Sequence, residues 1–402
     1  MIKMDGSGTS MLTWFVVMFF FIFLYPRLML AQLIYKLEQS AAKMESMSRA
    51  AQRLIRKRIG KKDKKISEKI RNYMEFFVVS PSDLDPYGIV KRIDTVVRQM
   101  EDKFKFFTNE LVGNKSQKLK QQINYGLRAG MSVHQIAKIV RHNVEMIKKF
   151  KNLQLAIILQ MQLPLIEKIA KSELLGTESF VNAWPVGDSI GPLVASSFMN
   201  KSKDIAEDIV MDEVVIEGRT CFVLKAKGPG PRLGRIDEAI KKIIKKHKIS
   251  RIITIDAASK LEGEKSGTVA EGVGFAMGGF HQRELIENIV LPRKIPLDSV
   301  AIKVGSEEAI EPMKLTIFKA LPKAQKLVKE IVKRSVKGSK IIIVGVGNSS
   351  GTPNTKRGIK DVEKLVKRVR QIVKKREKPK KQGILPLQAS NKALKSLLCL
   401  NN

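Results

Sequence analysis

The chain of 402 residues is long enough for two or three domains, and its 44% hydrophobic and 28% charged residues exclude an intrinsically disordered protein. Its 74 lysines and arginines exceed its 39 acidic residues, which gives a formal charge of +35. Such a charge favours polyanions, so ribosomes, RNA and anionic lipid are predicted partners, unless the excess is only compositional. Two cysteines exclude a disulfide framework and favour a reducing compartment.

The N-terminal segment predicts a transmembrane helix. Residues 11–26 carry no charge, and the apolar residues continue after Arg27 to the roughly 20 residues that a spanning helix needs. Trp14 and Tyr25 lie near the two ends, where interfacial aromatic residues belong. A cleaved signal peptide is the alternative, although no net positive charge precedes the apolar run. Because basic residues follow the span, we expect residues 1–31 to be a single-pass cell-membrane anchor with the C-terminal bulk in the cytoplasm.

Residues 32–175 read as a basic, all-helical region, either a bundle or a hairpin arm, because apolar residues recur there at helical spacing. The apolar stretch at 155–166 is too short for a second span, so we expect a core helix there. The run RKRIGKKDKK at 56–65 either binds anionic headgroups or serves as a solvated linker. The basic stretches that would bind ribosome, nucleic acid or lipid are residues 49–65, 115–151 and 356–382.

Residues 176–377 predict an α/β domain, because short β-branched runs alternate there with amphipathic helices. Residues 213–227 indicate a hairpin that turns at Glu217–Gly218. The other expected strands are residues 251–256, 298–304 and 340–347, and the later expected helices are residues 318–337 and 358–376. Uninterrupted apolar strands favour a mainly parallel sheet with helices on both faces. We expect the basic tail, residues 378–402, to be disordered or loosely docked.

Three polar residues in loops of this domain are candidate functional residues, because ligands bind at the carboxyl ends of parallel strands. Asp188 lies in a turn that opens a helix, Asp256 ends a buried strand, and His281 follows a glycine-dense loop. If they converge, two carboxylates and an imidazole could bind a divalent metal such as zinc or nickel, or carry out acid–base chemistry. Asp188 and His281 could instead only cap helices.

A fourth candidate is the glycine-rich string GVGNSSG at 345–351. Gly345, Gly347 and Asn348 would bind a phosphate-bearing cofactor if the backbone amides of this loop form an anion-binding cradle. The string lacks the lysine and the spacing of a P-loop.

The strings GDSIGPLV around Asp188 and ITIDAA around Asp256 resemble the acidic turn and the strand-end aspartate of the spore germination protease and the hydrogenase maturation endopeptidases. DAASKLEGEKSGTV is similar to the strand exit of the maturation endopeptidases, and His281 falls where their third metal ligand would be. The resemblance covers residues 180–335 and implies a phosphorylase/hydrolase-like fold. It also implies a peptidase that acts on a protein or peptide substrate, with Asp188 and Asp256 as its acidic pair. A second string, DEAI at Asp237–Glu238, could take the first acidic position instead.

The whole chain also resembles an archaeal membrane-anchored family described only as a domain of unknown function, which implies an archaeal source and no mechanism. Three predicted functions follow. The first is a membrane-tethered hydrolase or endopeptidase, with or without a metal. The second is a non-catalytic adaptor whose basic surfaces bind ribosome, nucleic acid or anionic lipid. The third is a nucleotide-binding regulator that uses Gly345–Gly351.

Overall fold

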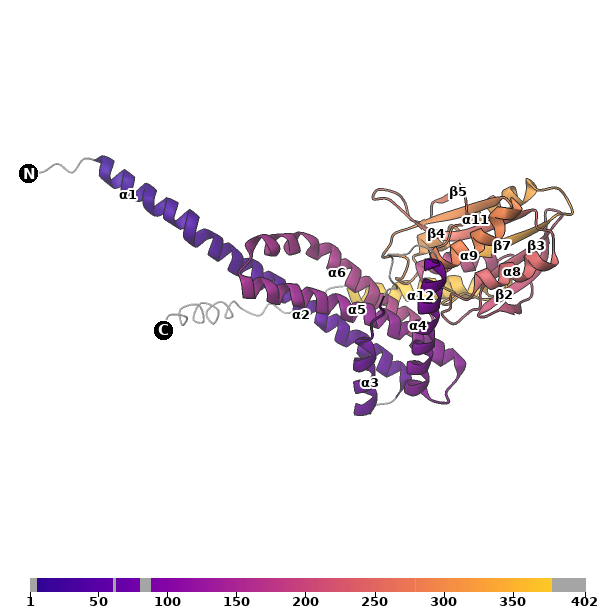
Figure 1. Ribbon diagram of the computed structural model, residues 1–402, viewed down its shortest axis with the longest axis horizontal. Coiled ribbons are helices and arrows are strands. Elements are labelled where there is room, and N and C mark those ends of the chain that lie inside the picture. The colour runs from indigo at the N-terminus through magenta and orange to yellow at the C-terminus, as the bar shows by residue number, and fades with distance from the viewer. Residues whose placement is uncertain (1–5, 61–62, 80–87, 279, 378–402) are drawn as a thin grey trace, which may run out of the picture.

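The computed structural model describes residues 6–60, 63–79, 88–278 and 280–377. A helical region comes first in the chain, and an α/β domain follows it (Figure 1). The predicted tail, residues 378–402, lies outside the described residues, as do residues 1–5 of the predicted anchor.

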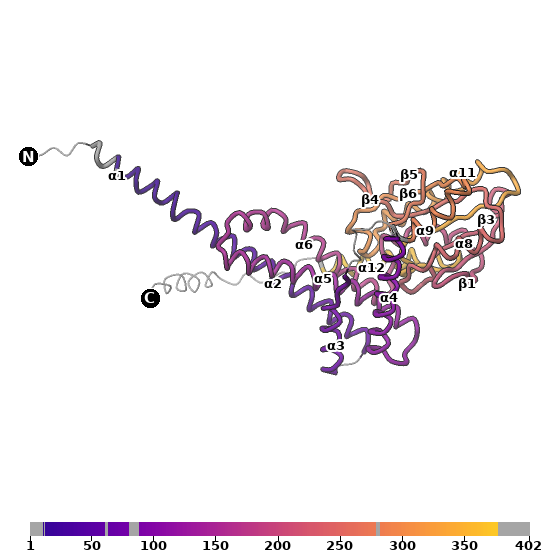
Figure 2. Tube along the Cα trace, in the orientation of Figure 1, coloured from indigo at the N-terminus to yellow at the C-terminus, as the bar shows by residue number. Residues whose placement is uncertain are grey.

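The chain begins with one continuous helix made of α1 (Gly6–Phe19), a π-helical turn η1 (Phe20–Leu24) and α2 (Tyr25–Ile59). Its first half projects away from the rest of the chain (Figure 2) and leaves large apolar side chains exposed, from Trp14 at 75% to Leu24 at 44%. The helix ends because Gly60 adopts a left-handed φ of 79° and donates its N–H to the carbonyl of Arg56. By length and composition, Thr13–Ile59 is a candidate membrane anchor.

The helical region packs α2 against α5 (Gln117–Phe150) and α6 (Leu153–Asn182), while α3 (Lys64–Met74) and α4 (Ile89–Val112) cover the end of α2 that is farther from α1. Gly130 permits close approach, since an added Cβ would lie 2.9 Å from Cε of Met74 and 3.1 Å from Cδ1 of Ile55. Helix α5 runs antiparallel to α2, because Lys115 donates to the carbonyl of Ile59 (2.7 Å) at one end while Lys148 pairs with Glu38 at the other.

The predicted core helix at 155–166 is buried on one face only. Leu159 and Leu163 of α6 lie in the core, whereas Met161 is 76% exposed and Leu165 is 61% exposed. Helix α6 is the second helix among the described residues that is long and apolar enough to cross a membrane. The prediction that residues 155–166 form a core helix is therefore wrong for the face of α6 that carries Met161 and Leu165, because that face is exposed.

The α/β domain contains these helices in chain order: η2 (Gly187–Ser189), α7 (Ile190–Ser196), α8 (Ile236–Lys246), α9 (Phe280–Val290), η3 (Leu291–Arg293), α10 (Leu315–Phe318), α11 (Leu321–Lys333), η4 (Lys356–Gly358) and α12 (Ile359–Glu377). Its strands are β1 (Lys203–Ala206), β2 (Ile209–Ile216), β3 (Arg219–Ala226), β4 (Arg251–Ser259), β5 (Val269–Val273), β6 (Leu297–Val304) and β7 (Lys340–Gly345). The predicted hairpin is confirmed: β2 and β3 pair antiparallel, and Glu217 and Gly218 form the turn with φ of 51° and 75°.

The sheet has the order β1-β2-β3-β7-β4-β6-β5 and is mixed. Among the described residues, the three central pairings are parallel (β3–β7, β7–β4 and β4–β6) and the three outer pairings are antiparallel. The prediction of a mainly parallel sheet is therefore wrong. The sequence analysis did not identify β1 and β5, because these edge strands are short and lack the apolar, β-branched pattern of the central strands.

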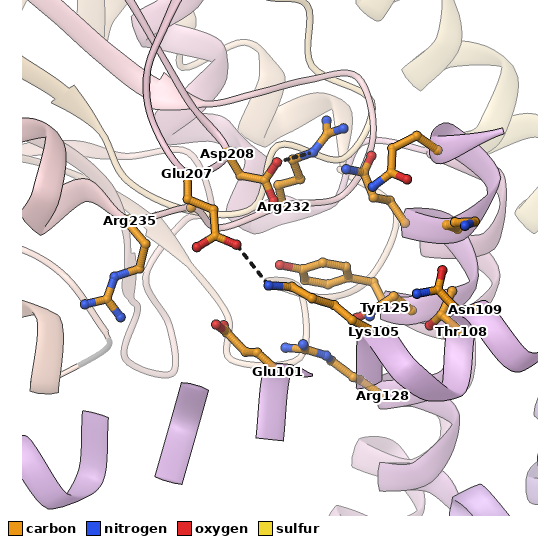
Figure 3. A pocket seen from close by; sticks show the side chains of 15 residues that line it. Glu101, Lys105, Thr108, Asn109, Tyr125, Arg128, Glu207, Asp208, Arg232 and Arg235 are labelled. Atoms are coloured by element: carbon orange, nitrogen blue, oxygen red, sulfur yellow. Dashed lines mark hydrogen bonds and ion pairs between the residues drawn. The ribbon is translucent and has the colours of Figure 1, made fainter. Parts of the chain in front are cut away.

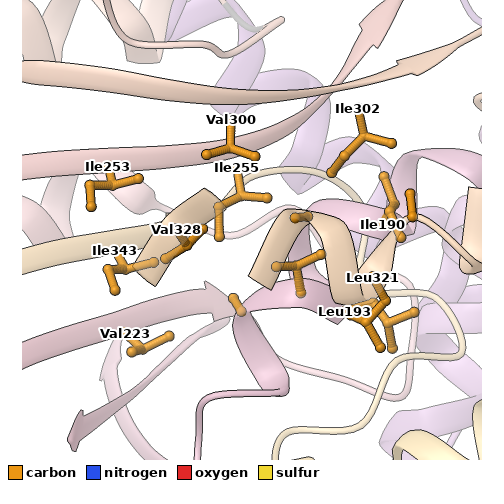
Figure 4. Packing of buried hydrophobic residues seen from close by; sticks show 14 of the residues in the cluster. Ile190, Leu193, Val223, Ile253, Ile255, Val300, Ile302, Leu321, Val328 and Ile343 are labelled. Carbon is orange, nitrogen blue, oxygen red and sulfur yellow. The ribbon is translucent and has the colours of Figure 1, made fainter. Parts of the chain in front are cut away.

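Helices cover both faces of the sheet, as predicted. On one face, α7, α10, α11 and α12 pack on residues such as Ile253, Ile255 and Ile343 (Figure 4). On the other face, α8 and α9 pack on residues such as Ile252 and Val344. After β4 the chain passes through the edge strand β5 and then α9, which lies on one face, whereas after β7 it enters α12, which lies on the other face. The gap between the carboxyl ends of β4 and β7 is therefore a topological switch point, where α/β sheets bind ligands.

Candidate acidic site at the rim of the sheet

Asp188 reaches this switch point because two glycines beside it permit close backbone contact. A Cβ on Gly187 would collide with the carbonyl of Glu308, and a Cβ on Gly191 would collide with the carbonyls of Val346 and Ile255. The string GDSIG thus presses η2 and α7 onto the ends of β4 and β7. The amide of Asp188 donates to the carbonyl of Ala309 (2.8 Å), which fixes the turn from the β6 side.

The Asp188 carboxyl is partly buried, and its Oδ2 accepts a hydrogen bond from the Asn348 amide at 2.6 Å. Burial raises the pKa of Asp188, and the hydrogen bond from Asn348 partly offsets that rise. No side-chain cap is formed at the start of α7, where Ser189 is the N-cap residue. The Asp188 side chain therefore binds the loop after β7 instead of capping its own helix.

The prediction that Asp256 ends a strand is wrong, because β4 continues to Ser259 along β6. Asp256 instead follows Ile255, which pairs with the last residue of β7 and whose carbonyl receives the Val346 amide at 2.9 Å. Its side chain is only 8% exposed, and its Oδ1 accepts from the Ala257 amide at 2.8 Å. Burial and then the nearby charge of Asp188 raise the pKa of Asp256 from 3.8 to about 8. The two aspartates thus lie close enough to interact, and the Asp256 carboxyl is mostly protonated at neutral pH.

The structure does not place the other candidate residues, His281 and Asp237, beside Asp188 and Asp256. His281 lies in the first turn of α9, and its side chain is outside what the structure describes. Within the described residues, no group of three histidine, cysteine, aspartate or glutamate side chains is arranged to hold a metal ion. Asp188 and Asp256 would supply at most two ligands. Asp237, the alternative first acid, lies in α8 and pairs with Arg235 at 2.8 Å.

The loop that follows β7 uses its backbone amides internally. Asn348 donates to Asp188, Ser349 donates to the carbonyl of Arg232 (2.9 Å), and Gly351 donates to the carbonyl of Pro229 (2.9 Å). Gly347 has a φ of 119° and lies directly against Asp188. These amides therefore position Asp188 and stabilise the neighbouring loop, which leaves few of them to cradle a phosphate.

The sequence analysis missed Lys225, which is fully buried at the carboxyl end of β3. Its ammonium donates to the carbonyl of Ala226 (2.8 Å) and to Oδ1 of Asn354 (3.1 Å). Burial lowers its pKa from 10.5 to about 7. Strand alternation could have identified it, because Cys221, Val223 and Lys225 share the face that packs against α7.

Glu308, in the segment after β6, was also missed. Burial acts to raise its pKa, but hydrogen bonds from Lys314 (2.7 Å), Ser266 (2.6 Å) and the Gly305 amide (2.9 Å) lower it to about 2. Because these partners engage both of its oxygens, Glu308 stabilises the turn beneath Gly187. Its sequence context, an acid among other polar residues, contains no pattern that would have singled it out.

These features define a class of protein: a long apolar N-terminal helix and a helical region precede a mixed α/β domain with two aspartates at a switch point of its sheet. Two models of one protein family match the chain. Residues 11–183 match the protein of unknown function (DUF1512) N-terminal domain, and residues 186–353 match the domain of unknown function (DUF1512) C-terminal. The chain belongs to the DUF1512 family. No curated protein matches the chain, and no solved structure matches it.

Proposed function

We propose that the α/β domain is a hydrolase in which Asp256 acts as the general acid and Asp188 as the general base. The observation that carries this proposal is the pKa of about 8 at Asp256, caused by burial and then by Asp188. A pair of carboxyls at a strand-end rim, of which one stays protonated at neutral pH, is the arrangement that acid–base hydrolysis requires. The residues that follow Asp256 on β4 approach the surface, since Ala257 is partly exposed and Ser259 is exposed.

The proposed substrate is a peptide amide, which the similarity of GDSIG and ITIDAA to peptidase motifs supports. The Asp188 carboxylate accepts a proton from a water molecule while the water oxygen bonds to the amide carbon. The carboxyl of Asp256 donates its proton to the carbonyl oxygen in the same step. The C–N bond of the tetrahedral adduct then breaks, the amine leaves with the proton from Asp188, and the hydroxyl proton of the adduct returns to Asp256.

We further propose that the apolar helix through α1 and η1 anchors this domain in a membrane, with the α/β domain on the cytoplasmic side. Exposed apolar side chains along Trp14–Leu24 support an anchor, and the basic residues after the helix support the orientation. The turn between α5 and α6 also lies near the end of the apolar helix, because Lys148 pairs with Glu38 and Lys43 pairs with Glu167. That hairpin exposes Phe150 and Ile158 beside three lysines, as a segment that contacts lipid headgroups would.

Proteolysis by the full chain in detergent, with fluorescently labelled casein as substrate, tests the hydrolase. We expect Asp188→Asn and Asp256→Asn each to lower the rate roughly 100-fold or more. Asp361→Asn is the matched control, since Asp361 is exposed in the first turn of α12. The rate should fall as pH rises through about 8, because Asp256 then loses the proton that it donates.

A wild-type rate equal to that of the double variant would contradict the hydrolase and favour the adaptor. The adaptor has one specific observation in its favour, a groove of about 500 Å³ whose walls include Lys319, Arg370 and Lys374. Activity that persists in EDTA would support the metal-free pair. Activity lost in EDTA and restored by zinc or nickel would favour a metal-dependent site that includes His281.

A further inference from the structure

A second candidate site lies between the two regions of the chain. A polar cavity of about 400 Å³ separates α4 and α5 from the β1–β2 turn and from the loop that joins β3 to α8 (Figure 3). Cavities of this size fall within the range of small-molecule sites. The aspartates at the rim of the sheet do not line it, so it is a separate site.

Charged side chains on the α/β side of the cavity already have partners. Arg232 lies 2.9 Å from Asp208, and Glu207 pairs with Lys105 of α4 at 2.9 Å. Arg235 pairs with Asp94 of α4 at 2.8 Å and with Asp237. These ion pairs join the two regions and leave this wall close to neutral.

The wall formed by α5 adds three polar atoms that have no hydrogen-bond partner among the described residues and no ion pair there. Oε1 of Gln121, Oδ1 of Asn124 and Nε of Arg128 are buried and form no hydrogen bond. Asn124 is only 8% exposed. Their spacing, together with Lys120, places all four on one face of the helix. Unpaired buried polar groups cost about 1–3 kcal/mol each, so a folded protein seldom keeps several together unless something else satisfies them.

Arg128 is held in place although it has no ion pair in the described residues. Its guanidinium carbon lies 4.8 Å from the ring centroid of Phe104 and 5.1 Å from that of Tyr125. Contact with both aromatic rings fixes the guanidinium beside the cavity, where it can donate to an anion. Lys120 adds a second positive charge, while Glu101 supplies one carboxylate.

We propose that this cavity binds a phosphate ester that also carries hydroxyl groups, of mononucleotide or sugar-phosphate size. Arg128 and Lys120 would bind the phosphate, because a guanidinium and an ammonium are the usual phosphate donors. The amide oxygens of Gln121 and Asn124 and the carboxylate of Glu101 accept hydrogen bonds, which the hydroxyl or amino groups of the ligand would donate. The ligand would thus satisfy the buried groups that the protein leaves unpaired.

Titration calorimetry on the full chain in detergent tests this, with AMP, ribose 5-phosphate and inorganic phosphate as the three probes. We expect both esters to bind at least tenfold more tightly than inorganic phosphate, because only they carry hydroxyl or amino groups beyond the phosphate that can donate to Gln121 and Asn124 while the phosphate contacts Arg128 and Lys120. Lys120→Met and Arg128→Met should each weaken binding of the esters roughly tenfold to a hundredfold, as the loss of a charge-assisted hydrogen bond predicts.

Lys118→Met is the matched control, since Lys118 is exposed on the same helix and does not line the cavity. Should Arg128→Met unfold, Lys120→Met still tests the phosphate contact, because Lys120 is only partly buried. The proposal is overturned if neither ester binds, if Lys120→Met binds as well as the wild type, or if inorganic phosphate binds as tightly as the esters.

Discussion

The α/β domain and the helical region differ in which unusual side chains they bury or expose. The α/β domain encloses its apolar residues between two layers of helices and buries several titratable groups, among them Asp256 and Lys225. The helical region does the reverse: Trp14, Met161 and Leu165 lie on its outside at 75%, 76% and 61% exposure.

Each departure has a different physical meaning. A buried acid or lysine costs free energy within the folded domain, so it points to chemistry or to a tightly specified local structure. Exposed apolar side chains cost free energy only in water, so they point to a second apolar phase outside the chain. The α/β domain therefore exposes only scattered apolar side chains, whereas the helical region exposes a continuous run of them from Trp14 to Leu24.

The largest effect should come from Asp256→Asn. The folded pKa of about 8 exceeds the ordinary 3.8, so the folded state holds a proton that the unfolded state has lost. Stability is thus lost as pH rises from about 4 to about 8, by up to roughly 5 kcal/mol. Because asparagine does not titrate, we expect the melting temperature of the variant to exceed that of the wild type at pH 8 and to lose this advantage at pH 4.

Thermal unfolding of the full chain in detergent between pH 4 and pH 9 measures this, again with Asp361→Asn as the control. If Asp256→Asn and the wild type differ by the same amount at every pH, then Asp256 has an ordinary pKa. The proposed general acid would then be ionised at neutral pH, and the contrast between the two regions would lose its clearest example.

Lys225→Met should give a smaller gain in stability with the opposite pH dependence. Because burial lowers the pKa of Lys225 from 10.5 to about 7, its cost grows as pH falls from about 10 to about 7 and then stays constant. Methionine removes that cost together with the two hydrogen bonds that Lys225 donates to Ala226 and Asn354, so we expect a net gain of about 2 kcal/mol below pH 7. The same pH scan measures it. A variant that is less stable than the wild type throughout would show that the two hydrogen bonds outweigh the buried charge.

The sequence predicted the parts of the α/β domain that depend on local pattern. The hairpin at Glu217–Gly218 follows from turn chemistry, and β4, β6 and β7 follow from apolar, β-branched runs. The edge strands β1 and β5 could not be found in this way, because pairing with a neighbouring strand, and not their own composition, makes them strands. Strand order likewise depends on contacts between distant residues, which a periodic pattern does not encode.

The two candidate sites also differ in whether local sequence pattern could identify their residues. Asp188 could be selected because it lies in a glycine-flanked turn, and Asp256 because it follows an apolar, β-branched run, although β4 continues beyond it to Ser259. Gln121, Asn124 and Arg128 could not, since each is an ordinary polar residue on a long helix. Only the docking of the helical region onto the α/β domain buries them and leaves them unpaired.

The smallest effect on stability, and the most direct test of the helical region, concerns the outer face of α6. We expect Ile158→Cys, Met161→Cys and Leu165→Cys to fold normally, because these side chains are largely exposed. Each variant also carries Cys399→Ser, so that the label reacts only at the new cysteine; Cys221 is buried. An environment-sensitive fluorophore at each position is then quenched by spin-labelled lipid in proteoliposomes.

Quenching should decrease in the order Ile158, Met161, Leu165, because α6 runs parallel to α2 and rises about 1.5 Å per residue away from the apolar helix. A label at Val336, which is 80% exposed on the α/β domain, is the matched control and should show little quenching. A label at Phe21 of the apolar helix distinguishes an error about the α5–α6 hairpin from an error about the membrane anchor. If Phe21 is quenched and α6 is not, the anchor is correct but the hairpin does not contact lipid. If neither is quenched, the exposed apolar surface of the helical region does not contact lipid, which contradicts the membrane anchor.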